Sequence, residues 1–264
     1  MSAHPPTPRA VVLASGSAGN VLLLEAGATR ILVDAGLSAE AIQRSLADVG
    51  VDPGGVSAIL LTHEHEDHAR GAGPLSRGFG IPMGANAATL AAGGAAFAGA
   101  AIRAFETDHP FEVGPFLITA FPVPHDAAAP FGFTLEVARQ RITVATDLGS
   151  TNEALERHLV GADLVILESN YDLRLLNVSG YPWFLKNRIL SPRGHLSNDD
   201  AARALARTAA AQARTVCLVH LSEVNNLASL ARDTALQAIA HAGGALGRVL
   251  AVPPNGRTCP IVLE

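Results

Sequence analysis

The sequence predicts an α/β fold of four layers, an αββα sandwich in which two β-sheets pack face to face and helices cover both outer faces. Two observations favour it. Short strand-like apolar runs alternate with amphipathic helical segments, and many of the runs end in His, Asp or Glu, which such a sandwich would gather along one rim. This order fits a single domain over residues 1–264, with two pseudo-equivalent halves at roughly 1–145 and 146–264.

The first half begins with strands that hairpin turns connect. Residues 10–14, 21–26 and 31–33 are expected to be antiparallel neighbours, with Gly27-Ala28-Thr29 as a turn. Ser38 then caps an amphipathic helix that ends at Gly50. The other expected elements of this half are strands at 56–61, 81–83 and 102–105, a small helix at 87–92, and an antiparallel meander of 116–123, 132–137 and 142–145.

The second half alternates helices and strands. Helices are expected at 152–159, 199–211 and 227–242, and strands at 164–167, 216–221 and near Val249. We find no short-period repeat and no low-complexity linker. Loops at one edge of the sandwich are therefore expected to carry the chemistry.

Composition is that of a globular enzyme, with 48% hydrophobic and 16% charged residues. Cys217 and Cys259 lie in apolar runs and are expected to be buried free thiols. No run of 18 apolar residues and no secretory leader is apparent, so we expect a cytoplasmic protein that does not enter membranes. The net charge of −5 argues against a protein that coats nucleic acid but allows a local basic patch.

Four potential metal ligands lie within six positions, in the motif His-Glu-His-Glu-Asp-His at residues 63–68. Side chains two apart in an extended segment point the same way, so His63 and His65 can hold one cation. The chain then turns, which directs Asp67 and His68 toward a second cation. Imidazole and carboxylate form the ligand set of Zn²⁺, and Mn²⁺ or Fe also fits where oxygen ligands increase. The alternative is a chance His-rich patch on a solvated turn.

Three more candidate ligands end apolar runs, although each alone could be a cap or a satisfied surface group. A natural partition gives His63, His65 and His125 to the first cation and Asp67, His68 and His220 to the second, with Asp147 bridging both. A bridging carboxylate would hold two cations about 3.5 to 4 Å apart, and a hydroxide shared between them would be the nucleophile. Asp34 is interpreted as a residue behind the ligands that accepts an imidazole N–H; alternatively it caps the helix that begins near Ser38.

These residues together resemble the metallo-β-lactamase superfamily, whose motifs are an early Asp at a strand end, HxHxDH, a lone His, a lone Asp and a late His. The match spans nearly the whole chain and uses, in order, Asp34, residues 63–68, His125, Asp147 and His220. The resemblance implies a hydrolase with two divalent metal ions, of which Zn²⁺ is favoured and Mn²⁺ or Fe is possible.

A closer resemblance is to the YycJ/WalJ branch, whose members are regarded as metal-dependent nucleases. It is carried by Ser15-Gly16-Ser17-Ala18-Gly19-Asn20, Glu168-Ser169-Asn170-Tyr171-Asp172, Tyr181-Pro182-Trp183, Gly194-His195-Leu196-Ser197-Asn198, and His220-Leu221-Ser222 with Asn225-Asn226. The activity that it implies is 5′-to-3′ exonuclease action on DNA.

The late part of the chain also looks like ribonuclease Z. By similarity, Glu168 and His195 would form a proton shuttle that protonates the leaving oxygen, and Asp67 counts with them among the catalytic residues. Expelling an alkoxide from a phosphodiester benefits from such an acid, whereas opening a lactam or thioester needs only metals and water. Alternatively, His195 is a cap partner of the helix that begins near Asn198.

Candidate substrate-binding residues are basic or polar. Arg174, Lys186, Arg188 and Arg193 lie within twenty residues and could contact phosphates, although a solvated basic face would look the same. The interleaved aromatic residues Tyr181, Trp183 and Phe184 could stack on bases, or form the apolar side of a short helix. The turn with Ser15, Ser17 and Asn20 could cradle a phosphate or be a simple tight turn, and Ser197 and Asn198 complete the set of candidates.

The sequence thus favours a metal-dependent phosphodiesterase acting on nucleic acid, with DNA favoured over RNA. Only twenty residues separate Asp147 from Glu168, which leaves no room for the insertion of β-CASP nucleases, and no long arm of the ribonuclease Z kind is evident. The alternative is a small-molecule hydrolase of the same fold acting on a thioester, lactone, β-lactam or cyclic nucleotide. A third hypothesis is a non-catalytic relative that binds metal or a protein partner.

Overall fold

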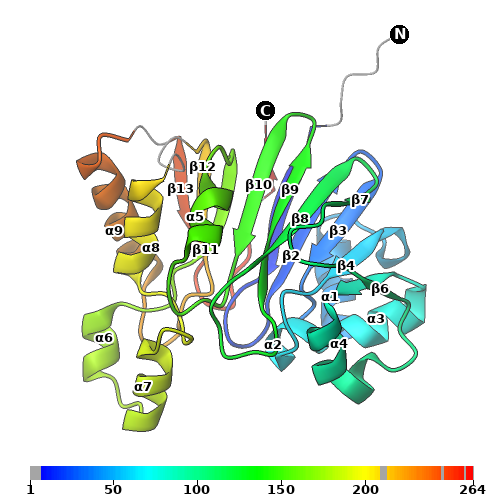
Figure 1. Ribbon diagram of the computed structural model, residues 1–264, viewed down its shortest axis with the longest axis horizontal. Helices are drawn as coiled ribbons and strands as arrows, with labels where there is room; N and C mark the ends of the chain where they lie inside the picture. Colours follow the sequence, from blue (N-terminus) through cyan, green and yellow to red (C-terminus); the bar gives the residue numbers. More distant parts are fainter. Residues whose placement is uncertain (1–6, 209–212, 245–246, 259, 264) are drawn as a thin grey trace.

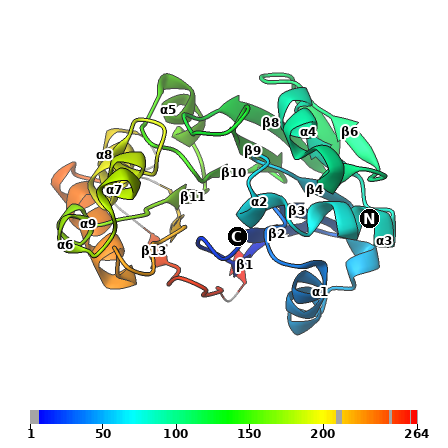
Figure 2. The ribbon, with the colours of Figure 1, turned by 90° about the horizontal axis from the view of Figure 1, so that it is seen from below.

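Two mixed β-sheets pack face to face in the computed structural model, and helices cover both outer faces (Figure 1). The view from below shows the four layers, with α1 and α3 outside one sheet and α5, α8 and α9 outside the other (Figure 2). The structure describes residues 7–208, 213–244, 247–258 and 260–263. The predicted αββα sandwich is therefore confirmed.

Each sheet has seven strands within the described residues. The first contains β1 (Arg9–Ala14), β2 (Val21–Ala26), β3 (Thr29–Val33), β4 (Ala58–Leu60), β5 (Met83–Ala85), β6 (Ile102–Ala104) and β14 (Ile261–Val262). The second contains β7 (Phe111–Val113), β8 (Phe116–Pro122), β9 (Phe131–Val137), β10 (Gln140–Ala145), β11 (Leu164–Glu168), β12 (Thr215–Val219) and β13 (Arg248–Ala251).

The helices lie on the outer faces and at one edge of the sandwich. They are α1 (Ala39–Asp48), α2 (Glu66–Ala69), α3 (Ala72–Phe79), α4 (Ala87–Gly93), α5 (Glu153–Leu159), α6 (Leu173–Val178), α7 (Trp183–Leu190), α8 (Asn198–Arg207) and α9 (Ala228–His241), with short 3₁₀ turns at Pro53–Gly55 and Gly94–Phe97. Searching the described helices for one long and apolar enough to cross a bilayer returned none.

The two sheets repeat one pairing pattern. In the order β14-β1-β2-β3-β4-β5-β6 the first three pairs are antiparallel and the last three parallel, and the order β7-β8-β9-β10-β11-β12-β13 repeats this. The sheets divide the chain between residues 104 and 111, and β14 returns to the first sheet. The division expected near residue 145 instead falls inside the second sheet, because β10 pairs with β9 before it and with β11 after it.

The main core lies between the sheets and takes side chains from both. Leu24 of β2 and Ile31 of β3 pack there with Phe133 of β9 and Ile166 of β11. Leu23, which points to the opposite face of β2, belongs to a second core beneath α1 and α3. Burial on both faces explains why strand residues 21–24 read as a continuous apolar run. Because the shared core joins the two sheets, we propose that the chain forms one domain.

Most of the predicted elements are present, with small shifts at their ends. The Ser38 cap is confirmed, since its side chain accepts a hydrogen bond from Ala41 N at the start of α1. The strand expected at 81–83 begins two residues later, because Pro82 has no N–H to donate to a neighbouring strand. Residues 209–211 of the helix expected at 199–211, and Cys259, lie outside the described residues, whereas Cys217 is a buried free thiol.

Candidate metal centre

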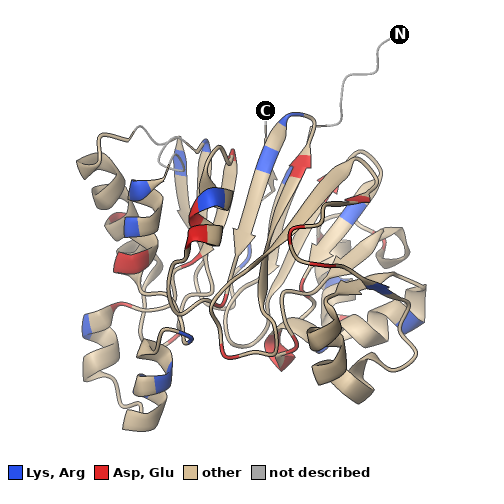
Figure 3. Cartoon of the chain, in the orientation of Figure 1, with Lys and Arg blue, Asp and Glu red and all other residues tan. Residues whose placement is uncertain are grey.

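The candidate ligands gather at one edge of the sandwich, where strands of both sheets end. Asp34 follows β3, Asp147 comes shortly after β10, and His220 follows β12. In Figure 1 this edge is the lower one, where α2 lies, and α6 and α7 extend beyond it; in Figure 3 acidic segments follow the same edge. Parallel strands bring their carboxyl ends to one edge, so residues distant in sequence meet there.

The described residues contain four groups of potential ligand atoms, and two of them have the same members as the two histidine-containing sets of the sequence partition. Atoms of His63, His65 and His125 lie within 4.8 Å of one another, and so do atoms of Asp67, His68 and His220. Asp147 forms a third such group with His63 and His68, and its Oδ2 lies 2.5 Å from His68 Nε2. The carboxylate therefore lies between the two sets of imidazoles.

Two ring nitrogens at this site are buried and have no hydrogen-bond partner among the described residues. They are Nε2 of His63 and Nε2 of His220. Buried polar atoms are normally paired, and an imidazole lone pair is what a divalent cation such as Zn²⁺ binds. These His and Asp clusters therefore fit divalent metal ions by the chemistry of their donors.

Asp34 holds the beginning of the motif in place. Its Oδ1 accepts the Thr62 N–H at 2.8 Å, and its Oδ2 contacts His68 Nδ1 at 2.7 Å. A carboxylate only accepts, so Nδ1 of His68 donates and Nε2 is left as the ligand atom. Ser38, not Asp34, caps α1. Thr62, whose hydroxyl also contacts Asp34, was not singled out from the sequence, although it directly precedes His63.

His125 is oriented by the backbone of a distant loop. Its Nδ1 lies 2.9 Å from the carbonyl oxygen of Gly194, which leaves Nε2 to face the other ligands. Arg193 braces the same loop, because its Nε donates to the His125 carbonyl at 2.9 Å. The approach is close: a Cβ added to Gly149 would lie 2.3 Å from Gly194 N and 2.5 Å from Arg193 N. Glycine is thus required at residue 149 for the loops to meet.

Glu168 is fully buried and fixes two histidines at once. Its Oε1 lies 2.8 Å from His195 Nδ1 and 2.8 Å from His220 Nδ1. Its Oε2 accepts the N–H groups of Leu148 and Leu196 at 2.9 and 3.1 Å. Four donors therefore converge on one carboxylate. Because both oxygens are occupied in this way, Glu168 orients the imidazoles and is not itself placed to donate a proton.

Three residues of the site have left-handed backbone conformations. The φ angles of Asp34, Asp147 and His220 are 62°, 54° and 55°. Such angles are uncommon outside glycine, although Asp and His adopt them more readily than most residues. Each residue sits just after a strand, and the turn swings its side chain from the strand direction into the site. Strained positions of this kind gather at functional sites.

Acidic neighbours keep two of the candidate ligands protonated in the metal-free site. Burial alone would lower the pKa of His68, but Asp147 and Asp34 outweigh it and hold the pKa well above its usual value. Burial is likewise outweighed at His220, where Asp147 and Glu168 raise the pKa to about 9. By contrast, burial lowers the pKa of His63 well below its usual value.

Metal binding at pH 7 should therefore release about two protons, one each from His68 and His220, because ligands must be deprotonated. The already neutral His63 contributes none. Since protons compete with the cation, the apparent affinity should rise with pH for as long as His68 and His220 still lose protons, the latter near pH 9. Calorimetric titration with Zn²⁺ in buffers of different ionisation enthalpy measures this release, with exposed His109→Ala as the control. Zero release at pH 7 would contradict the protonated state.

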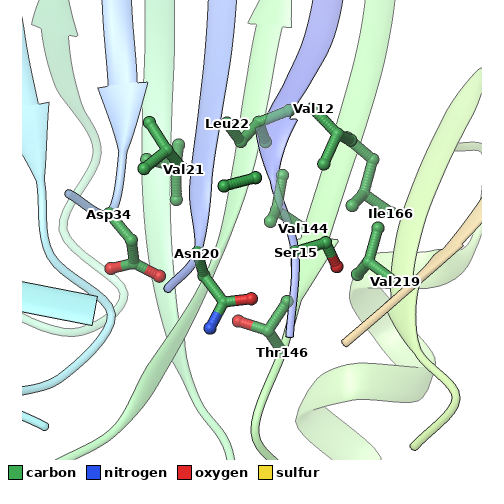
Figure 4. A pocket seen from close by; sticks show the side chains of 12 residues that line it. Val12, Ser15, Asn20, Val21, Leu22, Asp34, Val144, Thr146, Ile166 and Val219 are labelled. Atoms are coloured by element: carbon green, nitrogen blue, oxygen red, sulfur yellow. The ribbon is translucent and has the colours of Figure 1, made fainter. Parts of the chain in front are cut away.

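A small cavity lies directly behind the site, between the two sheets (Figure 4). Its volume is about 20 Å³, and its interior is lined by apolar side chains such as Val12 and Ile166. Ser15 and Asn20, two candidate substrate-binding residues, close it on the side of the ligands. Ser15 Oγ accepts the His220 N–H at 2.7 Å, and Asn20 Nδ2 lies 3.0 Å from His68 Nε2. Ser15 thus supports a candidate ligand from behind, whereas Asn20 contacts the ligand atom of His68 itself.

Four other candidate substrate-binding residues make framework contacts. Lys186 is buried, and its Nζ donates to the Asn177 carbonyl at 2.7 Å, which ties α7 to α6. Ser197 caps α8, and the Asn198 amide bonds with Asn226. Arg193 is bonded to the His125 carbonyl, as described above. Ser17 and Arg188 remain as the candidates that line the hollow formed by the candidate ligands.

Two acidic residues at the mouth of the site were missed in the sequence. Asp126 pairs with Arg188 of α7 through two hydrogen bonds, from Nε at 2.6 Å and from Nη2 at 3.2 Å. Glu64 accepts the Ala128 N–H at 2.7 Å and fastens the same loop from the other side. Their positions next to His63, His65 and His125 were the only sequence signal for either role.

Comparison with known proteins gives consistent matches. A family model described as the beta-lactamase superfamily domain matches residues 29–221. Exodeoxyribonuclease YycJ of Bacillus anthracis is 34% identical over 261 residues, covering 96% of this chain and 97% of the relative. Exodeoxyribonuclease WalJ of Streptococcus pneumoniae strain D39 is 37% identical over 241 residues, covering 89% of this chain and 90% of the relative.

Solved structures share the fold at lower identity. The metallo-beta-lactamase fold protein YhfI of Bacillus subtilis superposes with a TM-score of 0.76 at 20% identity, covering 97% of this chain and all of that one (100%). Human tRNase Z, short form, has a TM-score of 0.67 at 16% identity, covering 95% of this chain and 98% of that one. The family match and the relatives named exodeoxyribonuclease define the class: a metal-dependent hydrolase acting on ester bonds. The chain belongs to the metallo-β-lactamase superfamily, with YycJ and WalJ among its relatives.

Proposed function

We propose that this chain is an exonuclease that hydrolyses phosphodiester bonds of DNA with the help of two divalent metal ions. The relatives named exodeoxyribonuclease support the substrate, since they match this chain over nearly its whole length. The observation that carries the proposal is the hydrogen-bonded pair of Glu168 and His195, which lies against Asp147 beside the candidate metal ligands. This pair supplies the acid that a phosphodiester requires.

The two ligand sets divide between the cations. His63, His65 and His125 would hold one, Asp67, His68 and His220 the other, and Asp147 lies where it can serve both. Bound divalent cations of this kind lower the pKa of water and polarise phosphoryl oxygens. Zn²⁺ is favoured by the imidazole-rich set, and Mn²⁺ or Fe is compatible with the added carboxylates.

His195 is placed to act as the general acid. Its Nδ1 lies 2.8 Å from Glu168 Oε1 and 3.2 Å from Asp147 Oδ1, so Nε2 is the nitrogen left to reach a leaving oxygen. Burial lowers its pKa, but Glu168 and Asp147 outweigh burial and raise the pKa to about 10. The imidazole is therefore charged at neutral pH and can donate a proton to the departing sugar oxygen.

The direct test is cleavage of end-labelled nucleic acid. Protein loaded with Mn²⁺ or Zn²⁺ is incubated with single- and double-stranded DNA and RNA carrying a label at either end. We expect stepwise loss of nucleotides from DNA, abolished by chelator, and the position of the label gives the direction. A chromogenic lactam and a thioester test the small-molecule alternative. Hydrolysis of either of these, with no phosphodiester cleavage, would overturn the proposal.

A further inference from the structure

The hollow that the candidate ligands line is one end of a longer groove. The hollow, of about 210 Å³, is lined by ligands together with Ser17, Arg188 and His195. These three residues also line a second pocket of about 200 Å³, which Tyr181 and Ser222 border further out. Ser17, Tyr181 and Ser222 in turn line a third pocket of about 290 Å³. Shared lining residues make the three pockets continuous, and "the groove" below means the second and third.

The loop after His125, which contributes a ligand to the hollow, is fastened at two points. Asp126 is bonded to Arg188, and the neighbouring Ala128 N–H is bonded to Glu64, so the loop after His125 is held at both of these points. Because Arg188 lines both the hollow and the groove, the fastened loop holds in place a side chain that a strand in the groove would meet.

We propose that the groove binds one single strand of nucleic acid, with Tyr181 stacking on a base and Arg188 contacting a phosphate beside the scissile one. This inference rests on the proposed nuclease function and specifies how its substrate is held. Nothing in the sequence separated Tyr181 from its aromatic neighbours Trp183 and Phe184, which are 71% and 75% exposed and do not line the groove.

Tyr181 has the properties of a stacking platform. It is half-buried, because it packs against the small apolar cluster of Tyr171, Leu176 and Ile189 and also lines both groove pockets. Packing from behind restricts the ring, so little rotamer entropy is lost when a base lies on it. Stacking of this kind serves any base. A base inside a duplex is covered by its neighbours, so only an unpaired base can use the ring.

Arg188 has the properties of a phosphate contact. It lies between the hollow and the groove and lines both. The Asp126 pair uses Nε and Nη2, and since a guanidinium carries five N–H groups, donors remain for a phosphate. The same pair fixes the plane of the guanidinium before a phosphate binds.

At the far end of the groove, the Glu223 side chain accepts a hydrogen bond from the Asn255 side chain.

Equilibrium binding tests the groove separately from catalysis. A fluorescein-labelled single-stranded DNA octamer is titrated with Mn²⁺-loaded protein in a His195→Ala background, in which turnover is slow, and anisotropy gives Kd. We expect the single strand to bind at least about 10-fold more tightly than a blunt duplex of the same sequence. Tyr181→Leu, which keeps apolar volume but removes the ring, should weaken single-strand binding about 10-fold, whereas Tyr181→Phe should not.

Matched controls lie on the neighbouring helices. Trp183→Ala removes an exposed aromatic outside the groove and should change Kd less than about twofold. Arg188→Ala should weaken binding and lower the slope of log Kd against log salt by about one, whereas Arg174→Ala on α6 should not. Equal losses in the Tyr181→Leu and Trp183→Ala variants, or equal affinity for the duplex, would overturn the groove assignment. Tight binding that depends on Tyr181 without any cleavage by the wild type would instead refute the nuclease function alone.

Discussion

Replacing His195 with Ala lowers the rate of DNA cleavage by a factor of about 10² to 10⁴ while the metal content stays at the wild-type value. The reason is that the imidazole contacts Glu168 and Asp147 through Nδ1 and is not one of the seven residues proposed as ligands, although it lies within 4.8 Å of Asp147, Glu168 and His220. Its loss removes the acid and leaves the cations bound. Kinetics on labelled DNA and elemental analysis of the purified variant measure the two quantities, with His109→Ala as the matched control on an exposed histidine.

Two further readouts separate an acid from a merely structural residue. In the wild type, cleavage should fall as pH rises through the pKa of His195, because the charged form is the donor. The pKa of about 10 applies to the metal-free site, and bound cations would lower it by repulsion. The variant should lack this alkaline decline. It should also be less impaired on bis(p-nitrophenyl) phosphate, whose leaving group needs no proton. Equal impairment on both substrates, or loss of metal, would contradict the assignment.

The change Glu168→Gln should reduce activity by a factor of about 10³ or more. The four donors that converge on Glu168 need acceptors, and the amide offers one oxygen and an NH₂ group that faces other N–H groups. Leaving such groups unpaired in a buried position costs about 1–3 kcal/mol. His195 and His220 would lose their common anchor, so both the acid and one metal ligand are disturbed.

Thermal unfolding and metal content check this second result. For a chain of this size we expect the melting temperature to fall by roughly 2 to 4 °C for each kcal/mol lost. Elemental analysis should show less bound metal than in the wild type. Glu136→Gln is the matched control, since Glu136 lies partly exposed on β9 and pairs with Arg141. A Glu168→Gln protein with unchanged melting temperature and full metal content would show that the four hydrogen bonds to Glu168 contribute neither to stability nor to metal binding.

Much of the fold followed from local patterns. Strand residues 21–26 and the helix capped by Ser38 lie where the sequence places them, because short apolar runs, turn glycines and caps are short-range signals. Helix α3 was missed since Gly73, Pro74 and Gly78 make its segment a weak helix former. Strand β14 has two residues and pairs with residues 9 and 10 from the other end of the chain. No local pattern encodes such a pairing.

The candidate ligands were easier to find than the groups that hold substrate. His63, His65 and His125 group together because strand ends are predictable and few residue types bind metals. The role of a basic side chain, in contrast, depends on its three-dimensional neighbours. Lys186 and Arg188 are two residues apart on α7, yet one is buried against the Asn177 carbonyl and the other reaches the mouth of the site. Helical spacing turns them to different sides, and only the tertiary structure assigns each its partner.

The left-handed backbone at Asp34, Asp147 and His220 bears on attempts to engineer the enzyme. The left-handed conformation at each position destabilises the folded state by roughly 1–3 kcal/mol, and substitution by Gly or Asn would remove part of this cost. Laboratory evolution under selection for thermal stability alone should therefore accumulate Gly or Asn at these three positions. The selected variants would have higher melting temperatures but no activity. Mutant libraries meant to keep turnover should hold these three codons constant.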